Sequence, residues 1–355
     1  MFAAWRKRWR WSLAAVLLAV GMLVPFDWFL GQYTHLGIMI GLFTMVVVGL
    51  CLLMGYTGQV SLGHAAFYGV GMYVSAILST RYEVNPWLAM LVAALLTAAM
   101  ALALGPIFRL RGNYLALATL AVGFIIWKVA ELQSSYTGGP DGMTGVPYLS
   151  VGGFEFDSSF RRYYLIWGFC LAILLISQNI VNSRTGRALR AIHGSEAAAE
   201  SLGINVSRFK IKIFVLSAVY ASLAGSLFAH HAIHVSPGSF HPLVSIDLVV
   251  MAVVGGLASI WGALFGTGTM HILNDEILIH YGKWNMVISG LILIIILIFT
   301  PQGLFVALKE AYLRDGVWFL PKWFQGKWRD ASSWVLLRRE RWRGHVGADG
   351  GVRDP

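Results

Sequence analysis

Long apolar runs separated by short polar breaks dominate the chain. A helix that crosses a membrane needs about 20 mostly apolar residues, and about ten runs approach that length. These runs are Trp11–Leu30, His35–Met54, Leu62–Thr80, Pro86–Phe108, Tyr114–Leu132, Tyr163–Val181, Phe209–His231, Ser245–Ala258, Ile260–Ile279 and Trp284–Thr300. The pattern predicts an all-α, polytopic integral membrane protein with about 10 transmembrane helices. Nine or eleven crossings also fit, because the eighth run is short and the third begins inside a glycine-rich break.

The composition agrees with this class of protein. The 355-residue chain is 57% hydrophobic and 12% charged, whereas a soluble protein carries about 25% charged residues. Cys51 and Cys170 lie inside apolar runs, which favours buried thiols over a disulfide framework. The string "WRKRWRW" gives Trp11–Leu30 the basic start of a signal peptide. No small-residue cleavage pattern closes that run, so we interpret it as an anchored span.

The distribution of Lys and Arg predicts the orientation, because cytoplasmic loops carry the excess of basic residues. With the N-terminus inside, few of the 27 basic residues fall outside, namely Arg81, Arg161, Arg162 and Lys283. Both termini are therefore expected to be cytoplasmic. We expect a basic N-terminus over 1–10, a membrane domain over 11–303 and a Trp- and Arg-rich cytoplasmic tail over 304–355. The net charge of +10 then indicates orientation and contact with membrane lipid, with no nucleic acid as partner.

Two connections stand out for their length, and long loops tend to be functional. The outer loop, residues 133–160, is rich in Gly and turn residues. It is expected to receive an external protein or to act as a plain lid. The inner loop, residues 182–208, is expected on the cytoplasmic side and contains the string "SEAAAESLG".

The inner loop carries the signals of a short helix. Ser195 is a good N-cap, Glu196 suits the first turn, and Gly203 is a typical helix stop. Small side chains at Ala197 and Ala198 would let another surface approach closely. Arg187 and Arg190, three residues apart, lie on one helical face. A solvated basic loop without a partner is the alternative interpretation.

Two glycine-rich strings interrupt the apolar pattern: "GYTGQVSLGHAAF" at 55–67, the first break, and "VVGGLASIWGALFG" at 253–266, the second break. Broken helices in transport proteins place free backbone groups beside the solute. The candidate residues of a substrate path are Gly55, Tyr56, Gly58, Gln59, Ser61, His64, Gly255 and Gly256. Alternatively, these glycines let helices pack closely, and both interpretations stay open.

Ionisable groups inside the spans do not favour an independent carrier. A proton- or ion-driven carrier needs a carboxylate at mid-depth, and none has that position clearly. Lys128 and Glu131 are expected to pair with each other. Around His230 and His231 no Cys or acid completes a metal-ligand set, so no metal site is expected. The chain has neither a G-x-x-x-x-G-K-[ST] phosphate loop nor a paired acid and base, which predicts a transport subunit that is not an enzyme.

Eight strings also occur in the order typical of one family. They are "GYTGQVSLGHAAFYGVGMY", "RLRGNYLALATLAVG", "TGGPDGMTGV", "SRTGRALRAI", "AESLGINVSRFK", "SLAGSLFAHH", "VVGGLASIWGALFGT" and "TPQGL". Together they resemble the permeases of branched-chain amino acid ABC importers, of the LivM type, over about residues 35 to 305. The family's coupling loop carries E-A-A followed by a glycine, matched here by Glu196, Ala197, Ala198 and Gly203. Residues 304–355 extend beyond the usual end of such permeases.

The resemblance implies a permease that carries branched-chain, hydrophobic amino acids across the bacterial inner membrane. It implies four kinds of partner: a second permease of similar fold, two cytoplasmic ATP-binding subunits, a periplasmic or extracellular solute-binding protein, and membrane lipid. ATP would be bound by the partner subunits, and no cofactor is expected in this chain. A permease of the same family for urea or short amides is the first alternative. An ion-coupled secondary transporter is the second.

Overall fold

The computed structural model describes residues 33–109, 112–151, 153–278, 285–300 and 303–305. The chain divides into two compact units, Met1–Leu304 and Phe305–Pro355, and all of the described helices and strands belong to the first unit. The expected span Trp11–Leu30 and nearly all of the tail lie outside the described residues.

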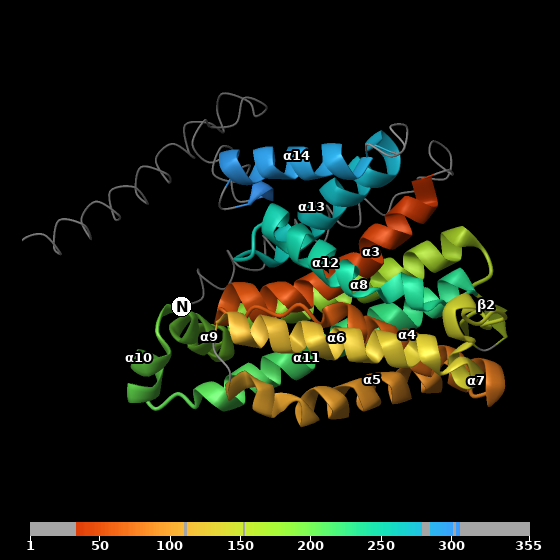
Figure 1. The fold of residues 1–355 in the computed structure, drawn as a ribbon, viewed down its shortest axis with the longest axis horizontal. Coiled ribbons are helices and arrows are strands. Elements are labelled where there is room, and N and C mark those ends of the chain that lie inside the picture. Colours follow the sequence, from red (N-terminus) through yellow and green to blue (C-terminus); the bar gives the residue numbers. More distant parts are fainter. Residues whose placement is uncertain (1–32, 110–111, 152, 279–284, 301–302, 306–355) are drawn as a thin grey trace, which may run out of the picture. The chain divides into compact units, whose positions relative to one another are not determined.

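The described part is built almost wholly from helices, with one small hairpin (Figure 1). In chain order the elements are α3 (Thr34–Leu50), the π-helical turn η2 (Cys51–Gly55), α4 (His64–Arg81), α5 (Pro86–Ala103), the 3-10 turn η3 (Gly105–Arg109), α6 (Asn113–Leu132), α7 (Ser134–Thr137), the 3-10 turn η4 (Gly139–Asp141), β1 (Ser150–Val151), β2 (Phe154–Glu155), α8 (Ser159–Asn182), α9 (Arg184–Gly194), α10 (Glu196–Ser201), α11 (Val206–Ala232), the 3-10 turn η5 (Pro237–Phe240), α12 (Pro242–Gly255), α13 (Ile260–His271), the π-helical segment η6 (Ile272–Ile277) and α14 (Asn285–Phe299). The expected all-α fold is confirmed.

The core lies where α11 packs against α4, α5 and α3. Glycines permit the closest of these approaches: a side chain at Gly71 would collide with the Ser222 carbonyl oxygen, and one at Gly225 with the Tyr68 carbonyl oxygen. The Ser226 hydroxyl also donates to the Gly71 carbonyl oxygen at 3.0 Å. Small residues at a helix crossing let two backbones touch, so α4 and α11 form a tightly joined pair.

Five described helices are long and apolar enough to cross a membrane: Thr34–Gly55, Pro86–Ala103, Asn113–Leu132, Ser159–Asn182 and Val206–Ala232. The expected span Leu62–Thr80 is the helix α4, which is less apolar and is mostly buried by its neighbours. A helix surrounded by protein can carry polar residues that a lipid-facing helix cannot. The expected span Pro86–Phe108 is too long, because α5 ends at Ala103 before Gly105 and Pro106.

The expected eighth and ninth spans are not two straight crossings. The helix α12 has 14 residues, or about 21 Å, which is shorter than the roughly 30 Å hydrocarbon core. The axis then turns by 116° into α13. The turn follows Gly256, whose φ of +103° suits glycine. The two helices therefore form one bent pair, and the total of about ten spans stays a prediction.

The outer loop is folded rather than extended. It contains α7, η4 and the antiparallel hairpin β1–β2. An isolated bridge pairs Met143 with Val235, just after α11, and the Trp87 indole donates to the Ser150 carbonyl oxygen at 2.7 Å. This loop and the helices α9 and α10 lie at opposite ends of the helix bundle (Figure 1).

Cys51 and Cys170 are free and buried, as predicted.

Candidate functional site

The helix α10 forms where the capping signals predict it. Ser195 has extended backbone angles, and its hydroxyl accepts a hydrogen bond from the Ala198 N–H at 3.3 Å. The helix ends after Ser201, and Gly203 follows with a φ of +79°. That left-handed conformation explains the glycine, since a Cβ at this position would meet nothing within 4 Å.

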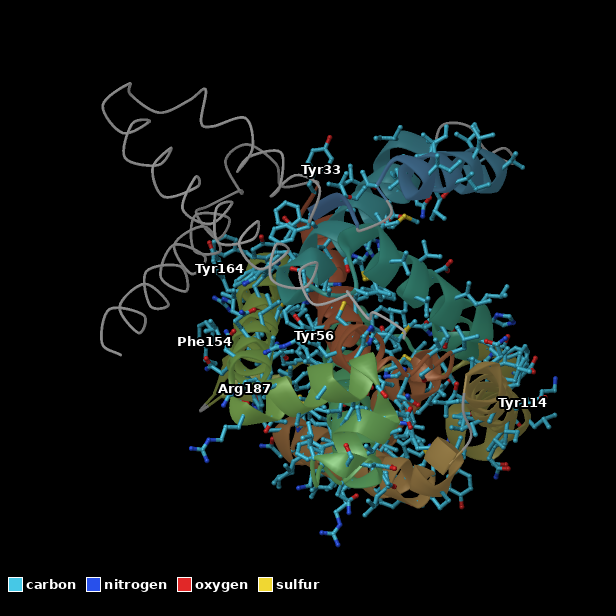
Figure 2. The ribbon with its side chains drawn as sticks, turned by 90° about the vertical axis from the view of Figure 1, so that its left-hand side faces the viewer. Tyr33, Tyr56, Tyr114, Phe154, Tyr164 and Arg187 are labelled. Carbon is cyan, nitrogen blue, oxygen red and sulfur yellow. The ribbon has the colours of Figure 1, made fainter. Side chains whose placement is uncertain are left out.

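The helix α9 is joined firmly to the end of α8. The Ser183 hydroxyl caps α9 by accepting from the Thr185 N–H at 3.1 Å. The Arg190 guanidinium donates to the Val181 carbonyl oxygen at 3.1 Å, so part of its hydrogen-bonding capacity is used within the chain. Arg187, by contrast, points away from the bundle (Figure 2). Of the two arginines predicted to couple to a partner, Arg187 is the better placed to reach one.

Glu196 pairs with a residue that sequence reasoning did not single out. The Lys210 ammonium lies 2.7 Å from Glu196 Oε1. The Lys210 side chain is 3% exposed and that of Glu196 is 31% exposed. A buried ammonium is costly without a partner, so Glu196 neutralises it and ties α10 to the first turns of α11.

One face of α10 is anchored and the other is open. Ala199 is buried with Ile192 and Val206 in a small apolar cluster. Ala197 and Ala198 are exposed, and Leu202 is 77% exposed. Within the described residues nothing covers this side of α10, so it is open to solvent or to another protein.

The two glycine breaks, about 200 residues apart in sequence, lie against each other. A side chain at Gly55 would collide with the Leu257 carbonyl oxygen. The Tyr56 hydroxyl donates to the Ala258 carbonyl oxygen at 2.8 Å. Gly255 packs just as closely on Gly262. The structure therefore brings together the predicted residues Gly55 and Tyr56 with the second break, and the close-packing interpretation is confirmed for Gly55 and Gly255.

The second break has a further neighbour near the end of the membrane domain. Gly303, with a φ of +93°, packs against the backbone of Gly256. A side chain at Gly303 would collide there. Glycine therefore suits both positions: each has a positive φ, and at Gly303 the backbone of Gly256 also leaves no room for a side chain.

The rest of the first break runs towards the inner loop. Gly58 has a φ of +71°, and a Cβ there would lie 3.2 Å from His193 Nδ1 at the end of α9. Gln59 is buried and donates to the Thr57 carbonyl oxygen at 3.4 Å. This segment thus lies between the bundle interior, where Tyr56 is found (Figure 2), and the α9 helix.

His64 is enclosed at the start of α4. It is 1% exposed. Its Nδ1 lies 3.1 Å from the Ser61 hydroxyl, and its Nε2 lies 3.0 Å from the Ser217 hydroxyl of α11. A small pocket of about 10 Å³ opens nearby, enough for roughly one water. Its lining is Gly63, Phe67, Leu104, Ile107, Thr119, Val122 and Phe214.

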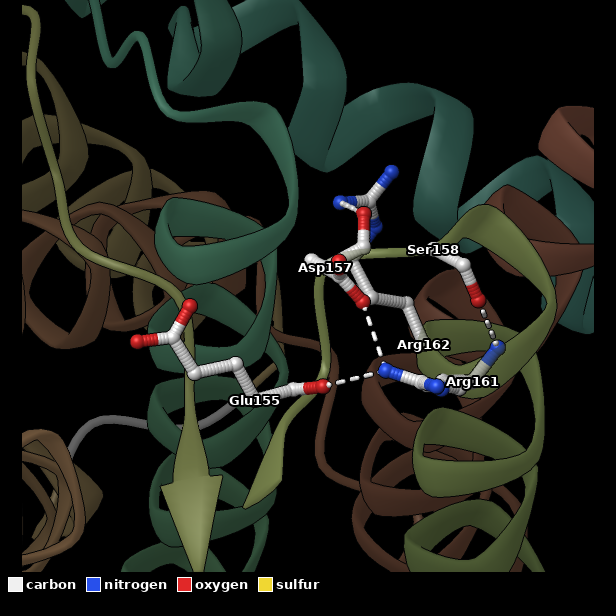
Figure 3. A network of polar contacts seen from close by, with 5 residues as sticks. All are labelled: Glu155, Asp157, Ser158, Arg161 and Arg162. Atoms are coloured by element: carbon white, nitrogen blue, oxygen red, sulfur yellow. Dashed lines mark hydrogen bonds and ion pairs between the residues drawn. The ribbon is translucent and has the colours of Figure 1, made fainter. Parts of the chain in front are cut away.

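The outer loop ends in a network of polar contacts at the start of α8 (Figure 3). The Arg161 guanidinium donates to Asp157 Oδ1 at 2.8 Å and to the Glu155 carbonyl oxygen at 3.0 Å. The Arg162 guanidinium donates to the Asp157 carbonyl oxygen at 2.8 Å. Ser158 caps α8 through the Arg161 N–H at 3.2 Å. The network fixes the hairpin to α8 while these residues remain at the surface.

Two further predictions concern charges and metals. Lys128 Nζ lies 2.6 Å from Glu131 Oε2, so the expected pair is confirmed. Within the described ranges no three His, Cys, Asp or Glu side chains are placed to hold a metal ion.

Comparisons with known proteins agree with one another. The family model for the permease component of branched-chain amino acid transport systems matches residues 33–297. The high-affinity branched-chain amino acid permease LivM of Salmonella typhimurium is 29% identical over 312 residues, 81% of this chain and 73% of that protein. LivM of Escherichia coli is 29% identical over 287 residues, 74% of this chain and 67% of that protein. The fructose import permease FruG of Bifidobacterium longum is 24% identical over 336 residues, 86% of this chain and 92% of that protein. Because the family model spans most of the chain, the protein belongs to the branched-chain amino acid transport system permease family, a family of multi-pass membrane proteins.

Proposed function

We propose that this chain is the permease subunit of an ABC importer that carries branched-chain amino acids across the bacterial inner membrane. Separate ATP-binding subunits supply the energy. The main support for this proposal is the helix α10. It is capped, and the Glu196–Lys210 ion pair joins it to α11. Ala197, Ala198 and the C-cap residue Leu202 are exposed. The place of α10 in a chain of this permease family favours a docking role over a solvated loop.

The mechanism follows from how α10 is attached. An ATP-binding subunit that holds the open face of α10 moves the helix when its nucleotide state changes. The Glu196–Lys210 pair transmits that displacement to α11, which has 27 residues and is about 40 Å long. Because α11 and α4 are in close backbone contact at Gly71 and Gly225, the two helices move together and change the environment of the breaks.

The complex contains more than this chain. We propose a second permease of similar fold, two ATP-binding subunits on the cytoplasmic side and a solute-binding protein outside. The outer loop is the candidate surface for the binding protein, because Arg161 holds its hairpin and the Met143–Val235 bridge holds the segment before the hairpin. A preorganised loop loses less conformational entropy on binding than a free one.

The proposed substrate is an amino-acid zwitterion with an apolar side chain. The breaks offer hydroxyls, amides and backbone groups, and neutral groups of this kind allow passage without a deep trap. Urea or a short amide would use the same groups, and the similarity to a fructose permease shows that relatives carry other solutes. The cognate binding protein decides between them: tight binding of leucine but not of urea or fructose supports the proposal.

The direct test uses the whole complex. Co-expressed with its genomic neighbours and reconstituted in liposomes, the chain should import labelled leucine only when ATP and the binding protein are supplied on the correct sides. Leu202→Arg should remove the ATP-binding subunit from the purified complex. For comparison, Leu117→Arg introduces the same charge at an exposed residue of α6, and membrane insertion is measured for both variants. Uptake by the chain alone, driven by an ion gradient, would instead establish a secondary transporter.

A further inference from the structure

We propose that His64 and Ser217 are positioning residues: they form a buried latch through which displacement of α11 moves the first glycine break. This inference rests on the proposed function and adds the route by which the inner helix acts on the substrate path. It depends on three features of the described residues: the latch geometry, the face of α11 on which it lies, and a second bridge that serves as a control.

The latch has a defined hydrogen-bond direction. The Ser217 hydroxyl donates its one proton to the Phe214 carbonyl oxygen at 2.8 Å. The bond of 3.0 Å to His64 Nε2 therefore requires that Nε2 carry the proton and donate. In a neutral imidazole Nδ1 is then the acceptor, so the Ser61 hydroxyl donates to it across 3.1 Å. One side chain on α4 thus joins α11 to the first break, and every polar atom in the chain of bonds has a partner.

The latch lies on the same face of α11 as the contact with α10. Lys210, which pairs with Glu196, precedes Ser217 by seven residues. Seven residues are two helical turns, so the two side chains are nearly aligned and about 10.5 Å apart along the axis. A displacement of α10 therefore acts on α11 at Lys210, and α11 in turn acts on His64 at Ser217. The Ser217 backbone also packs closely on Gly49 of α3, which restricts the position of α11 beside the latch.

The first break is bonded to α6 and α12 as well as to the His64 ring of α4. The Leu62 N–H donates to the Thr119 hydroxyl at 3.0 Å, and the Ala65 N–H donates to the Ser245 hydroxyl at 3.1 Å. Ser61, between Gly58 and Gly63, is bonded to the His64 ring itself. Movement of the ring therefore displaces the segment that contacts the second break through Tyr56.

A second serine–histidine bridge joins the same two helices at their other end. The Ser75 hydroxyl of α4 lies 2.9 Å from His230 Nε2 of α11. His230 Nδ1 lies 2.7 Å from the Pro147 carbonyl oxygen, which can only accept, so Nδ1 carries the proton and Ser75 donates. Both serines and both histidines are at most 1% exposed. The outer bridge matches the latch in burial and in its serine–histidine pairing, with the opposite hydrogen-bond direction, but contacts neither break. It therefore separates an effect on helix packing from an effect on the position of the break.

The experiment compares Ser217→Ala with Ser75→Ala in the full complex reconstituted in liposomes with its binding protein. Labelled leucine imported and ATP hydrolysed are measured together. In Ser217→Ala the leucine imported per ATP should fall about fivefold, the lower end of typical coupling strengths, while ATP hydrolysis continues. Ser75→Ala should keep the wild-type ratio. Both variants should lower the melting temperature of the purified complex, Ser217→Ala somewhat more, because it loses two buried hydrogen bonds and Ser75→Ala loses one.

The variants at the histidine divide the latch further. His64→Gln places an amide near the former Nε2 and should keep the bond to Ser217 and part of the coupling ratio, whereas His64→Ala should lose it. The inference is overturned if Ser217→Ala and Ser75→Ala change the ratio equally, or if neither does. A wild-type complex that imports leucine without ATP would overturn the proposed function, and the latch with it; normal wild-type coupling with an unaffected Ser217→Ala removes the latch alone.

Discussion

Replacing Glu196 by Ala takes the partner away from the Lys210 ammonium, whose side chain is 3% exposed. At the observed 2.7 Å the attraction is about 6 kcal/mol for an effective dielectric constant of about 20. Loss of hydration offsets much of this. Breaking a buried pair typically costs about 3–5 kcal/mol, and the 31% exposure of Glu196 lets water replace part of the lost contact. We therefore expect the free energy of unfolding to fall by about 2–3 kcal/mol.

The assay is the denaturation midpoint of the purified chain in detergent, with Glu200→Ala as control. Glu200 lies on the same helix and is exposed, so its removal should cost under about 0.5 kcal/mol. The double variant Glu196→Ala, Lys210→Met removes the buried charge together with its partner and should recover much of the stability. If Glu196→Ala is as stable as Glu200→Ala, the pair does not join α10 to α11. Equal loss in the single and double variants would refute the electrostatic explanation.

Three further predictions follow from the packing and the caps. Gly225→Ala should lower the free energy of unfolding by about 1–3 kcal/mol, because its Cβ would collide with the Tyr68 carbonyl oxygen. Gly168→Ala, in open space on α8, should be neutral or slightly stabilising in the same denaturation assay. Gly203→Val should strain the left-handed end of α10 by about 1–2 kcal/mol and reduce ATP-linked leucine uptake while membrane insertion, measured by membrane fractionation, stays normal. Ser195→Ala should cost about 1 kcal/mol through its lost N-cap bond and weaken retention of the ATP-binding subunit in pull-downs.

Local signals in the sequence predict local structure well. The ends of α10 follow from the Ser195 cap and the positive φ at Gly203, because both act within one helical turn. The Lys128–Glu131 pair follows from helical spacing in the same way. The end of α5 carries an equally local signal at Pro106, which an average of hydropathy over a long window hides.

Contacts between distant segments are beyond such signals. Nothing near Glu196 marks Lys210 as its partner, because the chain must turn back between α10 and α11 before the two meet. The His64–Ser217 contact joins residues 153 positions apart. The 116° bend between α12 and α13 is also invisible in the sequence, since hydropathy reports how apolar a segment is and not its direction. The glycines of the breaks can be recognised, but their role as mutual packing surfaces requires coordinates.

The bond from Tyr56 to Ala258 has a consequence for how the protein is made. The two residues are 202 positions apart, and protein synthesis adds about 5–20 residues per second. The Tyr56 hydroxyl and the bare backbone around Gly55 must therefore wait roughly 10–40 s for the later segment to emerge. During synthesis the first break lacks its contact with the second break until the segment between α12 and α13 has been made. Packing at the two breaks can therefore be completed only late in synthesis, after the second break has been added.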